Sequence, residues 1–245
     1  MTQLWRWPSV GYLAPFKLQR CNGRWRWSMR ALIQNDYELI VDGFHRSGTS
    51  SLAVGLSTLN PELRIRSHCH QAIHVIQAIT HHHRSAVVLI RNPLEAIPSA
   101  ARHLNCSLRL ATARYCAYYE SLHSHVGKLL VVPFVVLTSD LPATLDAVSA
   151  RLDLKQGARN RDELMTDIEA GVTQLPWGNS EATSSWPSQN REMMTDPLRS
   201  QFNGCEKLTR RSLSVWTSFL AASKQAGSLL RCPVQPRGPG VTTSL

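Results

Sequence analysis

Apolar residues gather into short runs from about residue 37 onward, and these runs predict buried strands. The segments "YELIVDGF" (37–44), "AVVLI" (86–90) and "LLVVPFVVL" (129–137) are apolar and short, as expected for parallel strands that are covered on both faces. The segment "LRIRSH" (63–68) predicts a further strand between the first two. The chain therefore offers four strands spaced well apart in the sequence.

Segments with helical spacing lie between these strands. Leucines recur three or four positions apart after the first strand, and isoleucines do so after the second. Strands that alternate with helices predict an α/β fold, with a parallel sheet sandwiched by helices in a single domain. The segments that predict helices are residues 50–59, 70–83, 92–104, 108–123, 141–154 and 205–224, the last of which is expected to pack Leu213, Trp216 and Leu220.

The helix expected after the third strand has a clear start signal. Asn92 can act as its N-cap, Pro93 suits the first helical position, and Glu95 can return a hydrogen bond to the cap. Pro98 lies inside the same segment, where proline removes a backbone hydrogen bond. We expect this helix to bend or shift just before Ser99.

The pattern divides the chain into a central domain and two flanking segments. Residues 1–36 form a basic, Trp-rich N-terminal extension, residues 37–231 form the α/β domain, and residues 232–245 form a flexible tail. Within the domain, residues 156–205 carry Gly, Pro, Ser and Asn without a sustained period. They predict a long loop or lid that forms the acceptor side of a site.

The charge balance favours an anionic partner. Lys and Arg number 27 against 17 Asp and Glu, which gives a formal net charge of +10 and a sequence pI near 9.8. Nucleotides, sulfated sugars, nucleic acids and membrane surfaces all fit such a balance. The six cysteines include no C-x-x-C pair, which favours reduced thiols. We find neither a signal peptide nor an apolar run long enough for a transmembrane segment, so a cytoplasmic protein is expected.

A glycine-rich loop follows the first strand. Residues 43–50, "GFHRSGTS", match the phosphate-loop pattern G-x-x-x-x-G-K-[S/T] except that Thr49 stands in place of the lysine. The cation is instead Arg46, two positions before Gly48. The order of strand, glycine loop and helix is that of a P-loop NTPase-like fold, in which backbone N–H groups and hydroxyls bind phosphate. Without the lysine, triphosphate chemistry lacks its main cation.

Two motifs together resemble the sulfotransferase family. "FHRSGTSSL" resembles the family's 5′-phosphosulfate loop, and "VVLIRNPLEAIPS" resembles its 3′-phosphate element. The family's donor is 3′-phosphoadenosine 5′-phosphosulfate (PAPS), whose product is 3′-phosphoadenosine 5′-phosphate. The resemblance implies that Arg91 and Ser99 hold the 3′-phosphate and that Arg46 neutralises charge on the leaving oxygen. The residues implied to bind the 5′-phosphate group are Arg46, Ser47, Gly48, Thr49, Ser50 and Ser51.

The resemblance also places a general base after the second strand. "RSH" (66–68) is similar to the Lys-Thr-His arrangement of cytosolic sulfotransferases, which makes His68 the catalytic candidate. The unperturbed pKa of histidine, near 6.5, suits that role. His70 occupies the position of a family proline and is the second candidate, and Glu62 is the third.

Some features of the sequence depart from the family or allow other chemistry. Near the C-terminus there is no Arg-Lys-Gly-x-x-Gly segment, which in cytosolic members closes over the 3′-phosphate. A zinc site at Cys69, His70, His74 and the run 81–83 is an alternative, but a zinc protease needs Glu where Gln71 stands. Arginines that can replace the missing segment are Arg191, Arg199, Arg210 and Arg211.

The sequence thus predicts a metal-independent sulfotransferase that transfers a sulfuryl group from PAPS to a hydroxyl or amine acceptor. The acceptor, whether small molecule, sugar or protein, is not specified by any motif. A P-loop nucleotide kinase or NTPase is one alternative function. A non-catalytic binder of nucleic acid or sulfated polysaccharide is another, although the two phosphate motifs favour a nucleotide over nucleic acid.

Overall fold

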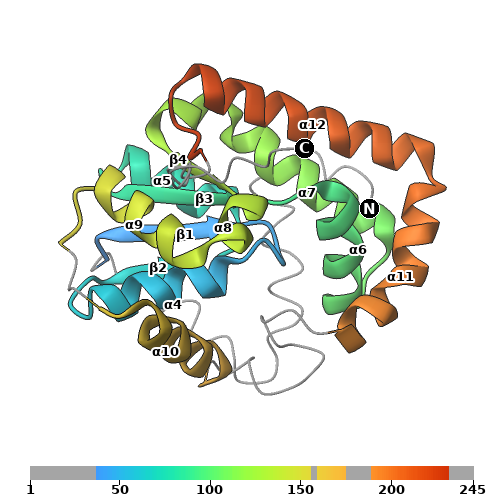
Figure 1. Ribbon diagram of the computed structural model, residues 1–245. Helices are drawn as coiled ribbons and strands as arrows, with labels where there is room; N and C mark the ends of the chain where they lie inside the picture. Colours follow the sequence, from blue (N-terminus) through green and yellow to red (C-terminus); the bar gives the residue numbers. More distant parts are fainter. Residues whose placement is uncertain (1–36, 156–158, 175–188, 232–245) are drawn as a thin grey trace, which may run out of the picture.

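A parallel sheet forms the centre of the protein. The computed structural model describes residues 37–155, 159–174 and 189–231 (Figure 1). Within them, a four-stranded sheet has the order β2-β1-β3-β4, and each neighbouring pair is parallel. The predicted α/β fold with a parallel sheet is therefore confirmed. The strands are β1 (Leu39–Gly43), β2 (Ile65–Ser67), β3 (Ser85–Ile90) and β4 (Leu130–Pro133).

Helices cover both faces of the sheet. Alternate residues of each strand point to opposite faces, and because residues of both kinds are apolar, both faces must be buried. In β1, Leu39 and Val41 pack on one cluster and Ile40 packs on the other. The first cluster includes residues of α4 (Thr49–Leu59), α8 (Phe134–Ser139), α9 (Leu141–Arg151) and α10 (Arg161–Gln174). The second includes residues of α5 (Ala72–Thr80), α6 (Pro93–His103), α7 (Leu108–Leu122), α11 (Gln189–Asn203) and α12 (Glu206–Gln225).

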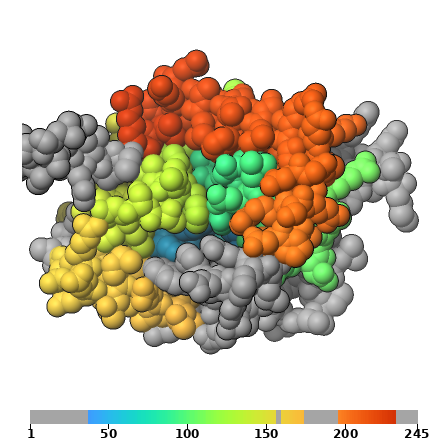
Figure 2. Space-filling view, turned by 45° about the vertical axis from the view of Figure 1, so that its right-hand side comes forward, coloured from blue at the N-terminus to red at the C-terminus, as the bar shows by residue number. Residues whose placement is uncertain are grey.

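The last two helices form the outer layer of the second face. Figure 2 shows α11 and α12, coloured from orange to red, as one continuous band along the surface. The predicted closing helix is confirmed as α12, but its fully buried apolar side chain is Phe219, and the expected Leu213 is only partly buried. Trp216 and Leu220 pack against the same cluster and are only partly buried. No helix among the described residues is long and apolar enough to cross a membrane.

The prediction of a long loop at residues 156–205 is wrong for much of its length. Residues 161–174 form α10 and residues 189–203 form α11. Leu164, Ile168 and Val172 recur every four residues along α10 and are buried against α4. The polar residues between them conceal this spacing in the sequence, and Pro197 conceals α11 by lying inside it. Residues 156–158 and 175–188 of the expected lid lie outside the described residues, as do the 1–36 extension and the 232–245 tail.

Two smaller expectations are also corrected. The run expected as one strand at 129–137 divides at Pro133: β4 ends there and α8 begins at Phe134, because proline cannot donate the next ladder hydrogen bond. In α6, Asn92 is confirmed as the N-cap, since its side chain accepts a hydrogen bond from the backbone N–H of Leu94. Glu95 does not bond back to the cap but to Arg91. The helix continues through Pro98 to His103.

Candidate functional site

The loop between β1 and α4 lies at the carboxyl edge of the sheet, where ligands of parallel α/β folds usually bind. Its backbone has two left-handed residues, Arg46 with φ 67° and Gly48 with φ 89°. Glycine adopts that conformation readily, whereas a positive φ at a non-glycine residue costs on the order of 1–3 kcal/mol. The strained conformation of Arg46 shows that the surrounding contacts hold this loop in one shape.

The two glycines of the loop lie where the chain passes very close to other elements. A Cβ atom at Gly43 would be 2.7 Å from the carbonyl oxygen of Leu89 in β3. A Cβ atom at Gly48 would be 2.5 Å from a methyl carbon of Leu137 and 3.1 Å from the ring of Phe134. Both distances are too short for a side chain, so the loop is packed against β3 and α8 through its glycines.

The first turn of α4 has hydrogen-bond donors that find no partner within the part of the chain that the structure describes. Gly48, the N-cap residue, has no side-chain cap, and the first N–H groups of any helix lack intrahelical acceptors. The Thr49 hydroxyl is buried and has no hydrogen-bond partner among the described residues. The Ser47 hydroxyl likewise makes no hydrogen bond of normal geometry among the described residues. Burial raises the pKa of the Tyr119 hydroxyl, and the nearby Ser47 hydroxyl offsets part of that rise. This arrangement suits an anion with several oxygen atoms.

The structure brings the second predicted anion element against this loop. Arg91, directly after β3, donates from one terminal nitrogen to the carbonyl oxygen of Arg46 at 3.1 Å. Ser99, on α6, accepts a long hydrogen bond of 3.4 Å from Nε of Arg46. Residues that are 45 and 53 positions apart in sequence therefore form one group. Two elements that bind separate phosphates of one small ligand must lie side by side, and these contacts place them so.

Two further residues, neither of which the sequence indicated as part of the site, hold the Arg91 side chain. Its Nε and one terminal nitrogen donate to Oε2 of Glu95 at 3.0 and 2.8 Å. The guanidinium carbon also lies 4.3 Å from the ring centroid of Phe134, within cation–π range. The same Phe134 ring lies close to Gly48, so α8 supports both anion elements. The apolar sequence of α8 gave no sign of this role.

Three tyrosines of α7 fix the strand ends below the loop. The Tyr119 hydroxyl donates to the carbonyl oxygen of Leu89 at 2.8 Å and accepts from the backbone N–H of Phe44 at 3.4 Å. The Tyr115 hydroxyl donates to the carbonyl oxygen of Arg91 at 2.8 Å. Tyr118 donates to the buried Asp42 carboxylate at 3.2 Å. Their spacing in the sequence indicates a buried helix face but not these partners.

His68 lies beside the loop, as its motif predicts. Its Nε2 atom is 2.7 Å from the Ser50 hydroxyl and its Nδ1 atom is 2.8 Å from the Ser67 hydroxyl. Burial, followed by the nearby charge of His70, lowers the pKa of His68 to about 3. The imidazole is therefore neutral near pH 7. Ser51, in the first turn of α4, is half-buried, and Glu62 is exposed on the turn before β2.

A cluster of imidazoles continues from His68 across the mouth of the loop. His70 stacks on His45 with ring centroids 4.0 Å apart, and His103 lies 6.2 Å from His45. Burial and the surrounding positive charges lower the pKa of His45 well below its usual value. Among the described residues, no three histidine, cysteine or acidic side chains are arranged to hold a metal ion. His74, part of the alternative zinc motif, instead lies 3.4 Å from a terminal nitrogen of Arg66.

The arginines expected to close over the 3′-phosphate have other partners in the described contacts. Arg199 pairs with Asp196 at 3.2 Å, Arg210 pairs with Glu206, and Arg211 lies 3.8 Å from Glu120. The side chain of Arg191 lies outside the described residues. The structure thus groups Arg46, Arg91 and Ser99 and does not bring Arg199, Arg210 or Arg211 to them.

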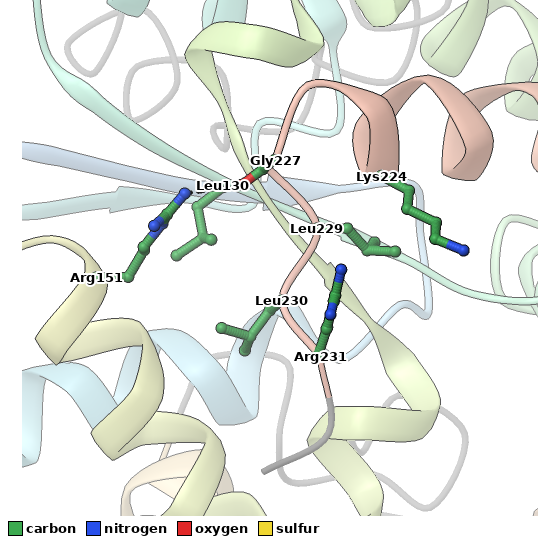
Figure 3. Close-up of a pocket in the computed structure, with 7 residues that line it drawn as sticks. All are labelled: Leu130, Arg151, Lys224, Gly227, Leu229, Leu230 and Arg231. Atoms are coloured by element: carbon green, nitrogen blue, oxygen red, sulfur yellow. Dashed lines mark hydrogen bonds between the residues drawn. The ribbon is translucent and has the colours of Figure 1, made fainter. Parts of the chain in front are cut away.

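A pocket of about 310 Å³ lies elsewhere on the protein (Figure 3). Leu130, at the start of β4, contributes to it, so the pocket opens near the amino edge of the sheet. Arg151 and Lys224 lie in the last turns of α9 and α12, where cations favour the negative helix end. Their positions are explained by the helices, and the pocket is separate from the loop. Its other lining residues are Gly227, Leu229, Leu230 and Arg231.

Comparisons of the chain with protein-family models, with curated proteins and with solved structures found no match.

Acid is expected to destabilise the protein from about pH 6.5 downward. Burial, followed by the charge of Arg66, lowers the pKa of His74 to about 4, and that of His68 is about 3. Histidines in the unfolded chain titrate near 6.5. Between these values the unfolded chain binds protons that the folded protein does not, so the free energy of unfolding falls as the pH falls.

Urea unfolding at a series of pH values measures this effect. His74→Gln should flatten the decline between about pH 6.5 and 4, whereas His81→Gln, at an exposed position, should leave it unchanged. A stability that stays constant from pH 7 to 4 in the wild-type protein would show that these histidines are not buried in the neutral form.

Proposed function

We propose that the protein is a sulfotransferase that uses 3′-phosphoadenosine 5′-phosphosulfate as donor and transfers its sulfuryl group to a hydroxyl or amine. The observation that carries the proposal is the contact between the two anion elements. Arg91 reaches the carbonyl oxygen of Arg46, and Arg46 reaches Ser99. One ligand with two separate phosphate centres fits this arrangement, and PAPS is such a ligand.

The β1–α4 loop would bind the 5′-phosphosulfate end. The N–H groups at the start of α4 and the hydroxyls of Ser47 and Thr49 would donate to the 5′-phosphate oxygens, with Ser50 and Ser51 beside them. The buried Thr49 hydroxyl supports this role, because it lacks a partner among the described residues. A nucleoside triphosphate would instead need a lysine at position 49.

Arg91 and Ser99 would bind the 3′-phosphate. The Arg91 guanidinium has five N–H donors, and its hydrogen bonds to Glu95 and to the carbonyl oxygen of Arg46 leave others for a phosphate. Glu95 and the Phe134 ring keep the guanidinium plane in a fixed orientation. A preorganised guanidinium loses less conformational freedom when a phosphate binds.

Transfer would proceed by in-line attack of the acceptor on sulfur. The bond between sulfur and the bridging oxygen breaks, and the charge that develops on this oxygen is neutralised by Arg46. A histidine beside the loop, His68 or His70, accepts the proton of the acceptor. This chemistry needs no metal ion, in contrast to phosphoryl transfer from ATP.

A thermal-shift panel tests the proposal. We expect 3′-phosphoadenosine 5′-phosphate to stabilise the protein in the presence of EDTA, by about 2.7 kcal/mol when the ligand is held at about 100 times its Kd. ADP without metal should stabilise it much less, since it lacks the 3′-phosphate. Equal stabilisation by ATP that depends on Mg²⁺ would identify a kinase or NTPase. Binding of polyanions alone, with steep salt dependence, would identify a non-catalytic binder.

A further inference from the structure

His70 is held at two points by the end of β1. Its backbone N–H donates to Oδ1 of Asp42 at 2.9 Å, and its Nδ1 atom lies 2.9 Å from the carbonyl oxygen of Gly43. A carbonyl oxygen can only accept, so Nδ1 must carry the hydrogen. In the neutral ring, the lone pair is then on Nε2. The contact with Gly43 thus selects the tautomer in which Nε2 can accept a proton.

The ring nitrogens of His68 are engaged differently. Both nitrogens contact serine hydroxyls, at 2.7 Å from Ser50 and 2.8 Å from Ser67. Whichever tautomer His68 adopts, the nitrogen with the lone pair faces a hydroxyl that can donate to it. To act as a base, His68 would first have to lose one of these hydrogen bonds. His70 has no such competitor for Nε2 in the hydrogen bonds of the described residues.

The backbone of both candidate histidines is in the strained left-handed conformation. His68 and His70 both have positive φ, 60° and 51°. For residues other than glycine this conformation costs on the order of 1–3 kcal/mol each, and such strain occurs preferentially at functional sites. The His70 ring, once turned in this way, is confined by Gly43 and by the His45 ring at 4.0 Å.

Asp42 fixes this arrangement from below. Its side chain is fully buried, accepts the His70 N–H and the Tyr118 hydroxyl, and has Oδ1 3.9 Å from Nδ1 of His70. Burial raises the pKa of Asp42, and the neighbouring His70 opposes that rise. A positive charge on the His70 ring would therefore be stabilised by the carboxylate. The same carboxylate is too deeply buried to meet an acceptor itself.

We propose that His70, rather than His68, is the general base, and that Asp42 is its positioning residue; this assignment rests on the proposed sulfotransferase function. The acceptor O–H or N–H proton moves to Nε2 of His70 as the acceptor atom forms its bond to sulfur. The bond from sulfur to the bridging oxygen breaks, and its electron pair stays on the 5′-phosphate beside Arg46. His70 then returns the proton to solvent.

The tautomer can be measured without any substrate. Long-range ¹H–¹⁵N correlation spectra of the full chain, labelled with ¹⁵N in histidine, distinguish a protonated from an unprotonated ring nitrogen. The His70→Gln variant identifies the His70 signals by their loss. At neutral pH we expect His70 to carry its hydrogen on Nδ1, and Asp42→Asn to shift or broaden these signals. A hydrogen on Nε2 of His70 in the wild-type protein would overturn the proposal.

Turnover of labelled PAPS, over a panel of phenols, sugars and tyrosyl peptides, tests the catalytic role. His70→Gln should lower kcat by about 10²- to 10⁴-fold, and should change the Kd of 3′-phosphoadenosine 5′-phosphate by less than about threefold, because the proposal gives His70 a contact with the acceptor and none with the product's phosphates. Asp42→Asn should lower kcat with KM for PAPS nearly constant. His81→Gln, at an exposed position beyond α5, serves as the control.

The outcomes distinguish a failure of the sulfotransferase function from a failure of the assignment of His70 as the base. If the wild-type protein neither binds the bisphosphate nor transfers label, the proposed function fails, and the assignment of His70 fails with it. If the wild-type protein does both and His70→Gln retains full turnover, only the assignment of His70 is wrong. A much larger loss in His68→Gln than in His70→Gln would return the role to His68.

Discussion

Gly48→Ala should disrupt the proposed anion site and destabilise the protein. Gly48 has φ 89°, and a Cβ atom there would lie 2.5 Å from Leu137 and 3.1 Å from the Phe134 ring. The left-handed conformation and the overlap with α8 each cost on the order of 1–3 kcal/mol. We expect a loss of about 2–6 kcal/mol in the free energy of unfolding, by urea denaturation, if the two costs add.

Binding should fall as well, because α8 also carries the ring that stacks on Arg91. If the Phe134 ring is pushed away from Gly48, it also loses its position against Arg91, and the loop and Arg91 are no longer held together. Gly127→Ala is the matched control: among the described residues, a Cβ atom there would meet only Ala226, at 3.9 Å. If Gly48→Ala binds 3′-phosphoadenosine 5′-phosphate like the wild-type protein, the close packing of the loop on α8 is not required for the site.

Arg91→Ala should weaken 3′-phosphoadenosine 5′-phosphate far more than adenosine 5′-phosphosulfate, which lacks the 3′-phosphate. A hydrogen bond to a charged group contributes about 1.5–3 kcal/mol, which corresponds to about a 10- to 150-fold rise in Kd for the bisphosphate. The Kd of adenosine 5′-phosphosulfate should rise less, because for this ligand the variant loses only the hydrogen bond by which Arg91 supports the Arg46 carbonyl oxygen.

The difference between the two ligands is the measurement, made by calorimetric titration of each. Arg210→Ala provides a control for the loss of one positive charge, since Arg210 is an exposed residue of α12 that pairs with Glu206. Equal losses for the two ligands in Arg91→Ala would show that Arg91 supports the loop and does not contact the 3′-phosphate.

The sequence was sufficient for the elements whose signals are local. The apolar runs of β1 and β3 are fully buried at most positions, so their composition reflects their environment directly. Asn92 forms its cap within two residues. The β1–α4 loop needs glycine at position 48 for reasons of backbone conformation, and that requirement is visible in the sequence as the phosphate-loop pattern.

Elements that depend on distant partners were not predictable. In α10 the buried positions are few and polar residues separate them, because only one narrow face contacts α4. From the sequence, Glu95 could accept a hydrogen bond either from the backbone N–H of the N-cap or from Arg91. It accepts from Arg91 because the end of β3 places that side chain beside it. Phe134 lies 43 residues from Arg91 in the chain, and no local pattern indicates that it stacks on the guanidinium.

The two candidate bases illustrate the same limit. The motif selects His68 by its position after β2, and the structure does place His68 beside the loop. What distinguishes His70 is its contact with the carbonyl oxygen of Gly43 and its hydrogen bond to Asp42. These partners come from another strand, so spacing within residues 66–70 could not reveal them.

Transfer of sulfur-35 from labelled PAPS, in EDTA and with each class of acceptor in turn, tests the sulfotransferase proposal most directly. We expect label to move to at least one hydroxyl or amine acceptor, with one molecule of 3′-phosphoadenosine 5′-phosphate released for each sulfuryl group transferred. Arg46→Ala should lower this rate, because its charge is needed at the leaving oxygen. PAPS that remains intact with every acceptor class, together with Mg²⁺-dependent consumption of ATP, would contradict the proposal.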